Sequence, residues 1–192
     1  MQPATERATP SQQAKSDDLV TRARNGDGAA WEELYRQAYQ RLTAFAYNRL
    51  RSVEDAQDAV SETISRAIAQ VHRYKGPDDL FVAWLFGILR HVVADHQRDQ
   101  AKRGRHRPPE DVELPVDPAE LLAAHAERAA VRRALARLDA DEQELLLLRA
   151  ASGLRSEEVA AAVGKKPSAV RMAQKRALAR LRVFLEEELH ED

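Results

Sequence analysis

Positive charge is concentrated in one short stretch near the carboxyl end of this chain. The chain as a whole is almost neutral, with 30 Lys and Arg against 31 Asp and Glu in 192 residues. From Ser168 to Arg182 it has no acidic residue and five basic ones, Arg171, Lys175, Arg176, Arg180 and Arg182. Such side chains hold phosphates and read guanine edges in the major groove. Because the stretch itself contains no acid that could neutralise them through i,i+4 ion pairs, it predicts DNA binding.

The other reactive side chains do not assemble a catalytic pattern. His91 and Asp95 are four residues apart on an expected helix and could share a metal ion, but a metal site needs a third and a fourth ligand. The chain has no cysteine, and it lacks the H-E-x-x-H, P-loop and G-x-S-x-G motifs. We therefore expect no catalytic residue, no metal and no cofactor. An enzyme is the main alternative to a DNA-binding protein, and these absences argue against it.

The composition favours a helical protein of the cytoplasm. Hydrophobic residues make up 44% of the chain and charged residues 32%, whereas aromatic residues make up only 5%. Ala and Leu dominate the apolar set, which favours helices. The absence of cysteine suits a reducing compartment, and the polar amino end is not a signal peptide. No apolar run reaches 18 residues, so we expect no membrane insertion.

Apolar residues recur at spacings of three and four almost throughout the chain, and they never alternate as in a strand. These patterns predict an all-α fold. The first half is expected to hold a helix that begins at Ser16, followed by helices over residues 29–50, 53–71 and 80–98. The second half is expected to hold helices over residues 118–138, 141–151, 156–163 and 167–189.

A change of composition divides the chain. Residues 100–118 contain four prolines and two blocks of opposite charge, and they show no helical period. We therefore expect two helical domains joined by a flexible linker. The predicted order is a disordered tail (1–15), a first domain (16–100), a linker (101–118) and a second domain (119–189).

The second domain ends in the layout of a helix-turn-helix. A short expected helix stops at Gly164, and Pro167 opens the long basic helix. In a helix-turn-helix the second helix enters the major groove, where its first residues contact bases and phosphates. The alternative is an ordinary solvated helix face, which charged stretches often are.

Two segments of the chain together carry a family likeness. EDAQDAVSETISRAI (54–68) and FVAWLFGILRHVVADHQRD (81–99) resemble conserved region 2 of bacterial sigma factors of the extracytoplasmic-function (ECF) type. LDADEQELLLLRAASGLRSEEVAAAVGKKPSAVRMAQKRALARLR (138–182) resembles their region 4. The order of the two regions and the linker between them are also those of the family. The Ala- and Arg-rich composition suits an actinobacterial branch of the family.

The resemblance implies a two-domain initiation factor that binds core RNA polymerase and directs it to promoter DNA. Its first domain would recognise and open the −10 element, and its helix-turn-helix would bind the −35 element. The family contacts the polymerase at the β′ clamp and the β flap. An anti-sigma factor, often membrane-anchored, commonly holds such proteins inactive, so we expect an anti-sigma partner here.

The resemblance also assigns roles to individual residues. Polymerase docking falls on one acidic face of the third expected helix, formed by Asp55, Asp58 and Glu62. Recognition and melting of the −10 element fall on His72, Arg73, Tyr74, Lys75, Arg90 and His91. Contact with the −35 element falls on Arg149, Lys166, Ser168, Arg171, Met172, Lys175 and Arg176. Each set also has a plainer interpretation as solvated helix or loop surface.

This sequence departs from the family pattern at several of these positions. An asparagine is usual at the position of His91, and an arginine is often found at the position of Gly87. Met172 replaces a common serine. The resemblance therefore fixes no base preference at either element, and Gly87 suggests close packing, because glycine costs about 1 kcal/mol relative to alanine inside a helix.

The first domain distinguishes the remaining alternative functions from a sigma factor. A stand-alone helix-turn-helix regulator would bind its operator without polymerase, and a response regulator would carry an α/β receiver with strands, which this sequence does not predict. A helical scaffold would not need the basic helix.

Overall fold

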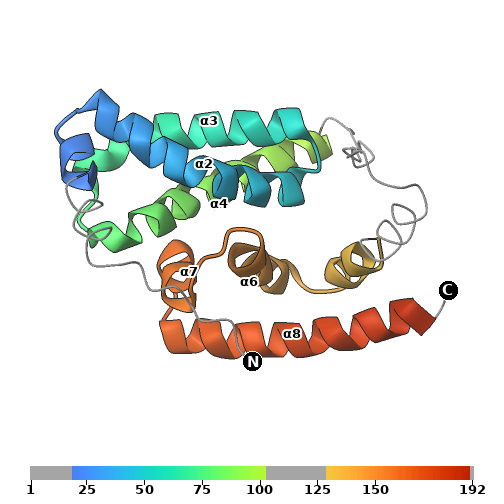
Figure 1. The fold of residues 1–192 in the computed structure, drawn as a ribbon. Coiled ribbons are helices and arrows are strands. Elements are labelled where there is room, and N and C mark those ends of the chain that lie inside the picture. The colour runs from blue at the N-terminus through green and yellow to red at the C-terminus, as the bar shows by residue number, and fades with distance from the viewer. Residues whose placement is uncertain (1–18, 103–128, 191–192) are drawn as a thin grey trace, which may run out of the picture.

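The part of the chain that the structure describes, residues 19–102 and 129–190, contains helices and turns but no strand. In this computed structural model each segment forms its own group of helices, and Figure 1 shows α7 lying between α4 and α8. The expected all-α fold with two helical domains is therefore confirmed. We call residues 19–102 the first domain and residues 129–190 the second domain.

The first domain is a bundle of three long helices with short helical turns at its ends. A short helix covers residues 19–24. The long helices are α2 (Gly28–Leu50), α3 (Val53–Gln70) and α4 (Phe81–Lys102). Two 3₁₀ turns, η1 (Val71–Arg73) and η2 (Asp78–Leu80), bracket the loop between α3 and α4.

Local sequence explains where these helices begin and end. The Asp27 carboxylate caps α2 by accepting hydrogen bonds from the backbone N–H groups of Ala29 and Ala30, at 2.9 and 3.2 Å. Arg51 ends α2 in the left-handed conformation, with a φ of 58°. The Ser52 hydroxyl then caps α3 by accepting from the Asp55 N–H at 3.2 Å. Two consecutive residues thus make a tight reversal between antiparallel helices.

Aromatic side chains connect the helices of the first domain within a core made mainly of Ala, Leu and Val. Phe45 of α2 and Phe86 of α4 meet edge to face, with ring centroids 5.8 Å apart. The Trp31 indole N–H donates to the Ala23 carbonyl at 3.2 Å, which fixes the short helix 19–24 onto α2. Phe81 packs against Trp31 at the start of α4. The loop before Phe81 is therefore attached to a rigid frame.

The described part of the second domain consists of two helices followed by the helix-turn-helix. Residues 129–136 form the described part of the first helix. It is followed by α6 (Ala140–Ala150), α7 (Ser156–Val163) and α8 (Pro167–His190). Asp139 and Glu142 make a reciprocal capping box at the start of α6. Gly164 ends α7 with a φ of 65°, a conformation that favours glycine.

A buried amide joins α6, α7 and α8 of the second domain. Gln174 of α8 is only 6% exposed. Its side-chain oxygen accepts from the Ser156 hydroxyl at 3.1 Å, and its amide nitrogen donates to the Leu145 carbonyl at 3.4 Å. Because Ser156 begins α7 and Leu145 lies in α6, these bonds fix the angle between the helices of the motif.

The two domains pack against each other rather than standing apart. One continuous apolar cluster includes Val92 and Val93 of α4 together with Leu148, Val159 and Ala162 of the second domain. The main contact is between α4 and α7, and α2 also touches α6. Figure 1 shows this closed arrangement of the two groups of helices.

The predicted helices match the observed ones closely. The main difference is α4, which continues to Lys102 instead of ending near residue 98. The predicted tail (1–15), most of the predicted linker (101–118) and the start of the predicted helix 118–138 lie outside the described residues. None of the described helices is both long and apolar enough to cross a membrane.

Candidate functional site

The amino-terminal half of α8 and the turn before it present a row of exposed polar and basic side chains. Lys166, Ser168, Lys175 and Arg176 are all exposed, and no ion pair is recorded for the three basic ones within the described residues. Met172 lies among them with 58% of its surface exposed. An exposed methionine within a row of cations forms a surface that can combine phosphate binding with apolar contact to a base.

Two other cations of α8 are paired with acids of neighbouring helices. Arg171 donates to Glu157 of α7 at 3.0 Å, and both side chains are more than half exposed. Arg180 donates to Glu142 of α6 at 2.7 Å and lies 5.7 Å from the centre of the Phe184 ring. Both acidic partners lie on neighbouring helices, so the spacing of charges along α8 alone does not reveal them. Arg180 therefore links α8 to α6 within the second domain.

Arg149 lies on α6, next to the turn that leads to α7. Its side chain is exposed, and Nη1 donates to the Leu154 carbonyl at 3.1 Å. That bond holds the guanidinium beside the helix-turn-helix. Beside this residue, an apolar groove of about 500 Å³ runs between residues 129–136, α6 and α8, lined by Val131, Leu135, Leu146 and Leu178 among others.

The loop between α3 and α4 is organised around Tyr74. The ring is 7% exposed and packs against Phe81 and Trp84, with centroids 5.4 and 5.1 Å away. Its hydroxyl donates to the Pro77 carbonyl at 2.5 Å. Burial, together with the nearby Asp78 and Asp79, raises the pKa of Tyr74 to about 12. Tyr74 is therefore an internal support of the loop in this structure.

Gly76 allows the loop to close over that ring. A Cβ atom at Gly76 would lie 2.7 Å from the Tyr74 hydroxyl oxygen and 2.8 Å from the adjoining ring carbon. Those distances are too short for any side chain. His72, Arg73 and Lys75 point outward and are exposed, so the buried Tyr74 and the bare Gly76 together present these three polar side chains to solvent.

Arg90 and His91 lie further along α4, on the side that faces the second domain. His91 is exposed. Arg90 is bound by both oxygens of Glu144 on α6, at 3.1 Å from Nε and 2.8 Å from Nη2. The hydrogen bonds to Glu144 raise the pKa of Arg90, although burial opposes them. Nothing in the sequence pattern pointed to Glu144, because its partner lies 54 positions earlier in the chain.

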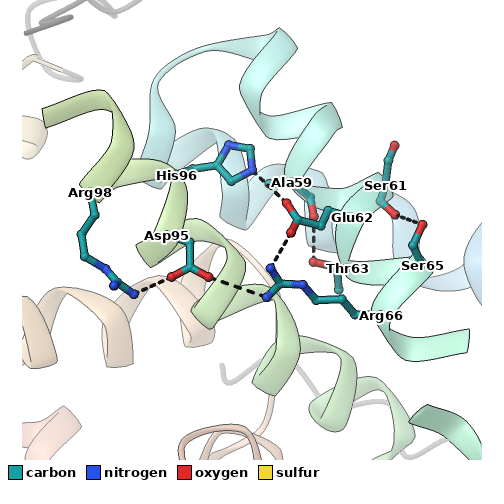
Figure 2. Close-up of polar contacts among 9 residues, drawn as sticks. All are labelled: Ala59, Ser61, Glu62, Thr63, Ser65, Arg66, Asp95, His96 and Arg98. Carbon is teal, nitrogen blue, oxygen red and sulfur yellow. Dashed lines mark hydrogen bonds and ion pairs between the residues drawn. The ribbon is translucent and has the colours of Figure 1, made fainter. Parts of the chain in front are cut away.

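The predicted docking acids do share one face of α3, but they differ in what surrounds them. Asp58 is exposed, and no described residue binds it. Asp55 accepts a hydrogen bond from Gln100 of α4 at 2.8 Å. Figure 2 shows Glu62 between Arg66 of its own helix and His96 of α4, with the His96 Nε2 atom 3.2 Å away. Asp58 is thus the acid most available to a partner.

Asp95, one member of the possible metal pair with His91, has other partners in the structure. Asp95 is bound by Arg98 at 2.5 Å and lies 3.7 Å from Arg66, as Figure 2 shows. No group of three or more His, Asp or Glu side chains that could hold a metal ion occurs within residues 19–102 and 129–190.

Comparisons with known proteins identify both domains. The family model of Sigma-70 region 2 matches residues 34–103, and that of Sigma-70 region 4 matches residues 128–181. The chain is 34% identical over 181 residues to the ECF RNA polymerase sigma factor ShbA of Streptomyces griseus, covering 88% of this chain and 94% of ShbA. It is also 34% identical to the ECF sigma factor SigD of Mycobacterium tuberculosis, covering 86% and 82% of the two chains.

Solved structures agree with the sequence comparisons. CnrH, in complex with the cytosolic domain of CnrY, matches with a TM-score of 0.69 at 27% identity, over 90% of this chain and 98% of that one. The sigma factor RpoE of Bartonella quintana, in complex with the anti-sigma factor NepR, matches with a TM-score of 0.61 at 26% identity, over 81% and 96%. With both regions present in order and actinobacterial relatives matched over nearly their whole length, this chain belongs to the family of ECF RNA polymerase sigma factors.

Proposed function

We propose that this protein binds core RNA polymerase and directs it to promoters through two separate DNA contacts, one in each domain. The observation that carries the proposal is the exposed row on α8, where Lys166, Lys175 and Arg176 have no recorded acidic partner in the described structure. The family membership supplies the context in which such a row binds the −35 element. The proposed activity is binding and promoter opening in the cytoplasm rather than catalysis.

The −35 contact is proposed for the amino-terminal half of α8. Arg171, Lys175 and Arg176 can hold phosphates or read guanine, and Arg149 and Lys166 can anchor the motif on the DNA backbone. Met172 can contact a thymine methyl group, a contact that the usual serine does not offer. Ser168 lies at the exposed start of the same helix.

The −10 contact is proposed for the loop between α3 and α4 and for one side of α4. The exposed side chains of His72, Arg73 and Lys75 can stack on an unpaired base or hold its phosphates. Tyr74 is buried in this structure, so we propose that it supports the shape of the loop that presents these three side chains. Arg90 and His91 are proposed to read the upstream edge of the element.

Polymerase docking is proposed for the α3 face of Asp55, Asp58 and Glu62 on the β′ clamp. The apolar groove of the second domain offers a surface for the predicted contact with the β flap. We also propose an anti-sigma partner, since the solved structure of RpoE contains the anti-sigma factor NepR.

A binding experiment with core polymerase tests the docking face. Asp58→Arg should weaken binding to core enzyme at least about tenfold, because an exposed acid of the proposed docking face is replaced by a side chain of opposite charge. Glu32→Arg makes the same charge change at an exposed site on α2 and should leave the affinity unchanged. Equal core affinity for both variants and the wild type would refute the docking face.

A further inference from the structure

Two of the three proposed docking acids on α3 are held by side chains of the neighbouring helix α4. Nε2 of Gln100 donates to Asp55 Oδ2 at 2.8 Å, and His96 Nε2 lies 3.2 Å from Glu62 Oε2. Gln100 and His96 are four residues apart, so they lie on the same face of α4. One face of α4 therefore contacts the docking face and orients two of its carboxylates.

The Glu62 carboxylate has a partner at each of its oxygens. Oε1 accepts from Arg66 of the same helix at 2.5 Å, and Oε2 faces His96, as Figure 2 shows. The Glu62 side chain is 40% exposed and that of His96 only 23%. Glu62 is thus fixed in direction by two contacts and still reaches the surface, where a partner protein can meet it.

The last turns of α4 are themselves anchored. The Gln97 amide nitrogen donates to the Arg49 carbonyl at 3.0 Å, and Arg49 Nη2 donates back to the Gln97 side-chain oxygen at 3.3 Å. The residue next to His96 therefore ties α4 to the end of α2. The sequence pattern predicted that this helix ends near residue 98, but α4 continues to Lys102, and the added turn carries Gln100 to Asp55.

The contact between His96 and Glu62 depends on the charge of the imidazole. Histidine is the side chain that changes charge between pH 5 and 8. A neutral ring with its proton on Nε2 donates a hydrogen bond to Glu62, whereas a protonated ring adds a positive charge beside that of Arg66. The carboxylate then offers less negative charge to a basic surface.

The other charged groups around His96 come from all three long helices of the first domain. The pocket beside it, of about 320 Å³, is lined by charged residues of α3 and α4, and α2 adds Arg49 through its bonds to Gln97. The lining residues are Glu62, Arg66, Asp95, His96, Arg98, Asp99 and Lys102. Asp95 is bound by Arg98 at 2.5 Å, and Asp99 lies 3.4 Å from Lys102, so Glu62 is the acid that His96 contacts directly.

We propose that His96 and Gln100 are positioning residues for polymerase docking and that protonation of His96 weakens this docking. Gln100 and neutral His96 hold Asp55 and Glu62 in the direction that a basic partner surface meets, while the exposed Asp58 contributes directly. Protonated His96 offsets part of the charge of Glu62. The inference rests on the proposed function, because it acts through the docking face.

The positioning role of Gln100 is tested by titrating core RNA polymerase with the full chain at pH 8. Gln100→Leu keeps the size of the side chain and removes the donor, so the affinity should fall by about fivefold. Gln97→Leu makes the same change three residues earlier, where it breaks the bonds to Arg49 instead, and it should stay within about twofold of wild type. Equal losses in the two variants would reduce Gln100 to structural support and overturn its positioning role.

The role of His96 is tested by repeating the titration at pH 5.5. His96→Gln keeps a neutral donor at both pH values, so it should match wild type at pH 8 and bind core enzyme about fivefold more tightly than wild type at pH 5.5. Titration of groups on the polymerase affects both proteins alike and leaves this ratio unchanged. A ratio of affinities that is the same at both pH values would overturn the protonation effect, and a purely structural role of His96 predicts that result.

Asp58→Arg distinguishes failure of this inference from failure of the proposed function. If Asp58→Arg binds core enzyme as tightly as wild type, the proposed docking face is wrong and the positioning roles are wrong with it. If Asp58→Arg binds weakly while Gln100→Leu and His96→Gln match wild type at both pH values, the docking face stands and the positioning inference alone is refuted. Urea denaturation of each variant at both pH values shows that folded proteins are being compared.

Discussion

At the scale of single residues, two arginines of α8 that look alike in the sequence have different surroundings. Arg176 is exposed and has no recorded acidic partner within the described residues. Arg180, one turn later, is bound to Glu142 and lies near the Phe184 ring. The first is therefore free to bind DNA, and the second stabilises the second domain.

Arg176→Ala should weaken promoter binding and leave the fold intact. We expect a loss of about tenfold in affinity, and a log–log salt slope smaller by about 1, because one phosphate contact is removed. Fluorescence titration of a promoter fragment with the holoenzyme at several salt concentrations measures both quantities. An unchanged slope would mean that Arg176 does not contact a phosphate.

Arg180→Ala serves as the matched comparison on the same helix. It should lower the free energy of unfolding by roughly 1 kcal/mol, because it leaves Glu142, whose side chain is only 15% exposed, without its cation. Its effect on the salt slope should be smaller than that of Arg176→Ala. Urea denaturation measures the stability. A larger loss of stability in Arg176→Ala, together with a larger change of salt slope in Arg180→Ala, would contradict these assignments.

The raised pKa of Tyr74 predicts that the free energy of unfolding depends on pH. Its pKa is about 12 in the folded protein and close to 10 in the unfolded chain, so its contribution is complete below pH 10 and is lost as the pH rises towards 12. Tyr74→Phe removes the bond to the Pro77 carbonyl and should be less stable by about 1 kcal/mol at pH 8. The difference in free energy of unfolding between wild type and Tyr74→Phe, measured by urea denaturation, should be smaller at pH 11 than at pH 8. A difference that stays the same at both pH values would contradict this role of Tyr74.

At the scale of helices and turns, the signals that act over a few residues were sufficient for prediction. A helix was expected from residue 53, and Ser52 caps the helix that begins there. Gly164 was expected to end a helix and does so with a positive φ. These features depend on neighbouring residues only, so the sequence carries them directly. The acidic face of α3 follows from the same helical period.

Ser52→Ala should destabilise the first domain by about 1 kcal/mol, because the hydroxyl is buried and caps α3. Ser61→Ala makes the same change at an exposed position in the middle of α3 and should alter stability by less than about 0.5 kcal/mol. Urea denaturation of both variants is the measurement. Equal losses of unfolding free energy in Ser52→Ala and Ser61→Ala would show that the capping hydrogen bond of Ser52 does not stabilise the domain.

Contacts between distant helices could not be predicted in this way. Glu157 and Glu144 looked like ordinary acids of their own helices, yet they bind Arg171 and Arg90. Tyr74 was assigned to −10 recognition and melting, which stays a prediction, and its burial within the loop in this structure was not foreseen. In each case the partner is fixed by the packing of whole elements, which helical period and composition do not describe.

At the scale of the whole molecule, the order of the two regions was predictable and their arrangement was not. Residues 54–99 and 138–182 carried the family likeness, and the family comparison confirmed it. The packing of α7 on α4 appears only in the structure. The assignment of individual residues to the −10, −35 and docking contacts stays a prediction.

The most direct test of the central claim is the mapping of transcript starts made by this protein with purified core RNA polymerase from a related bacterium. A pool of genomic promoter fragments should give discrete starts that share a −10 and a −35 element. Deletion of residues 120–192 should abolish most of them, because the −35 contact is proposed for the second domain. Absence of discrete starts, together with sequence-selective DNA binding by the protein alone, would contradict this account and favour a stand-alone regulator.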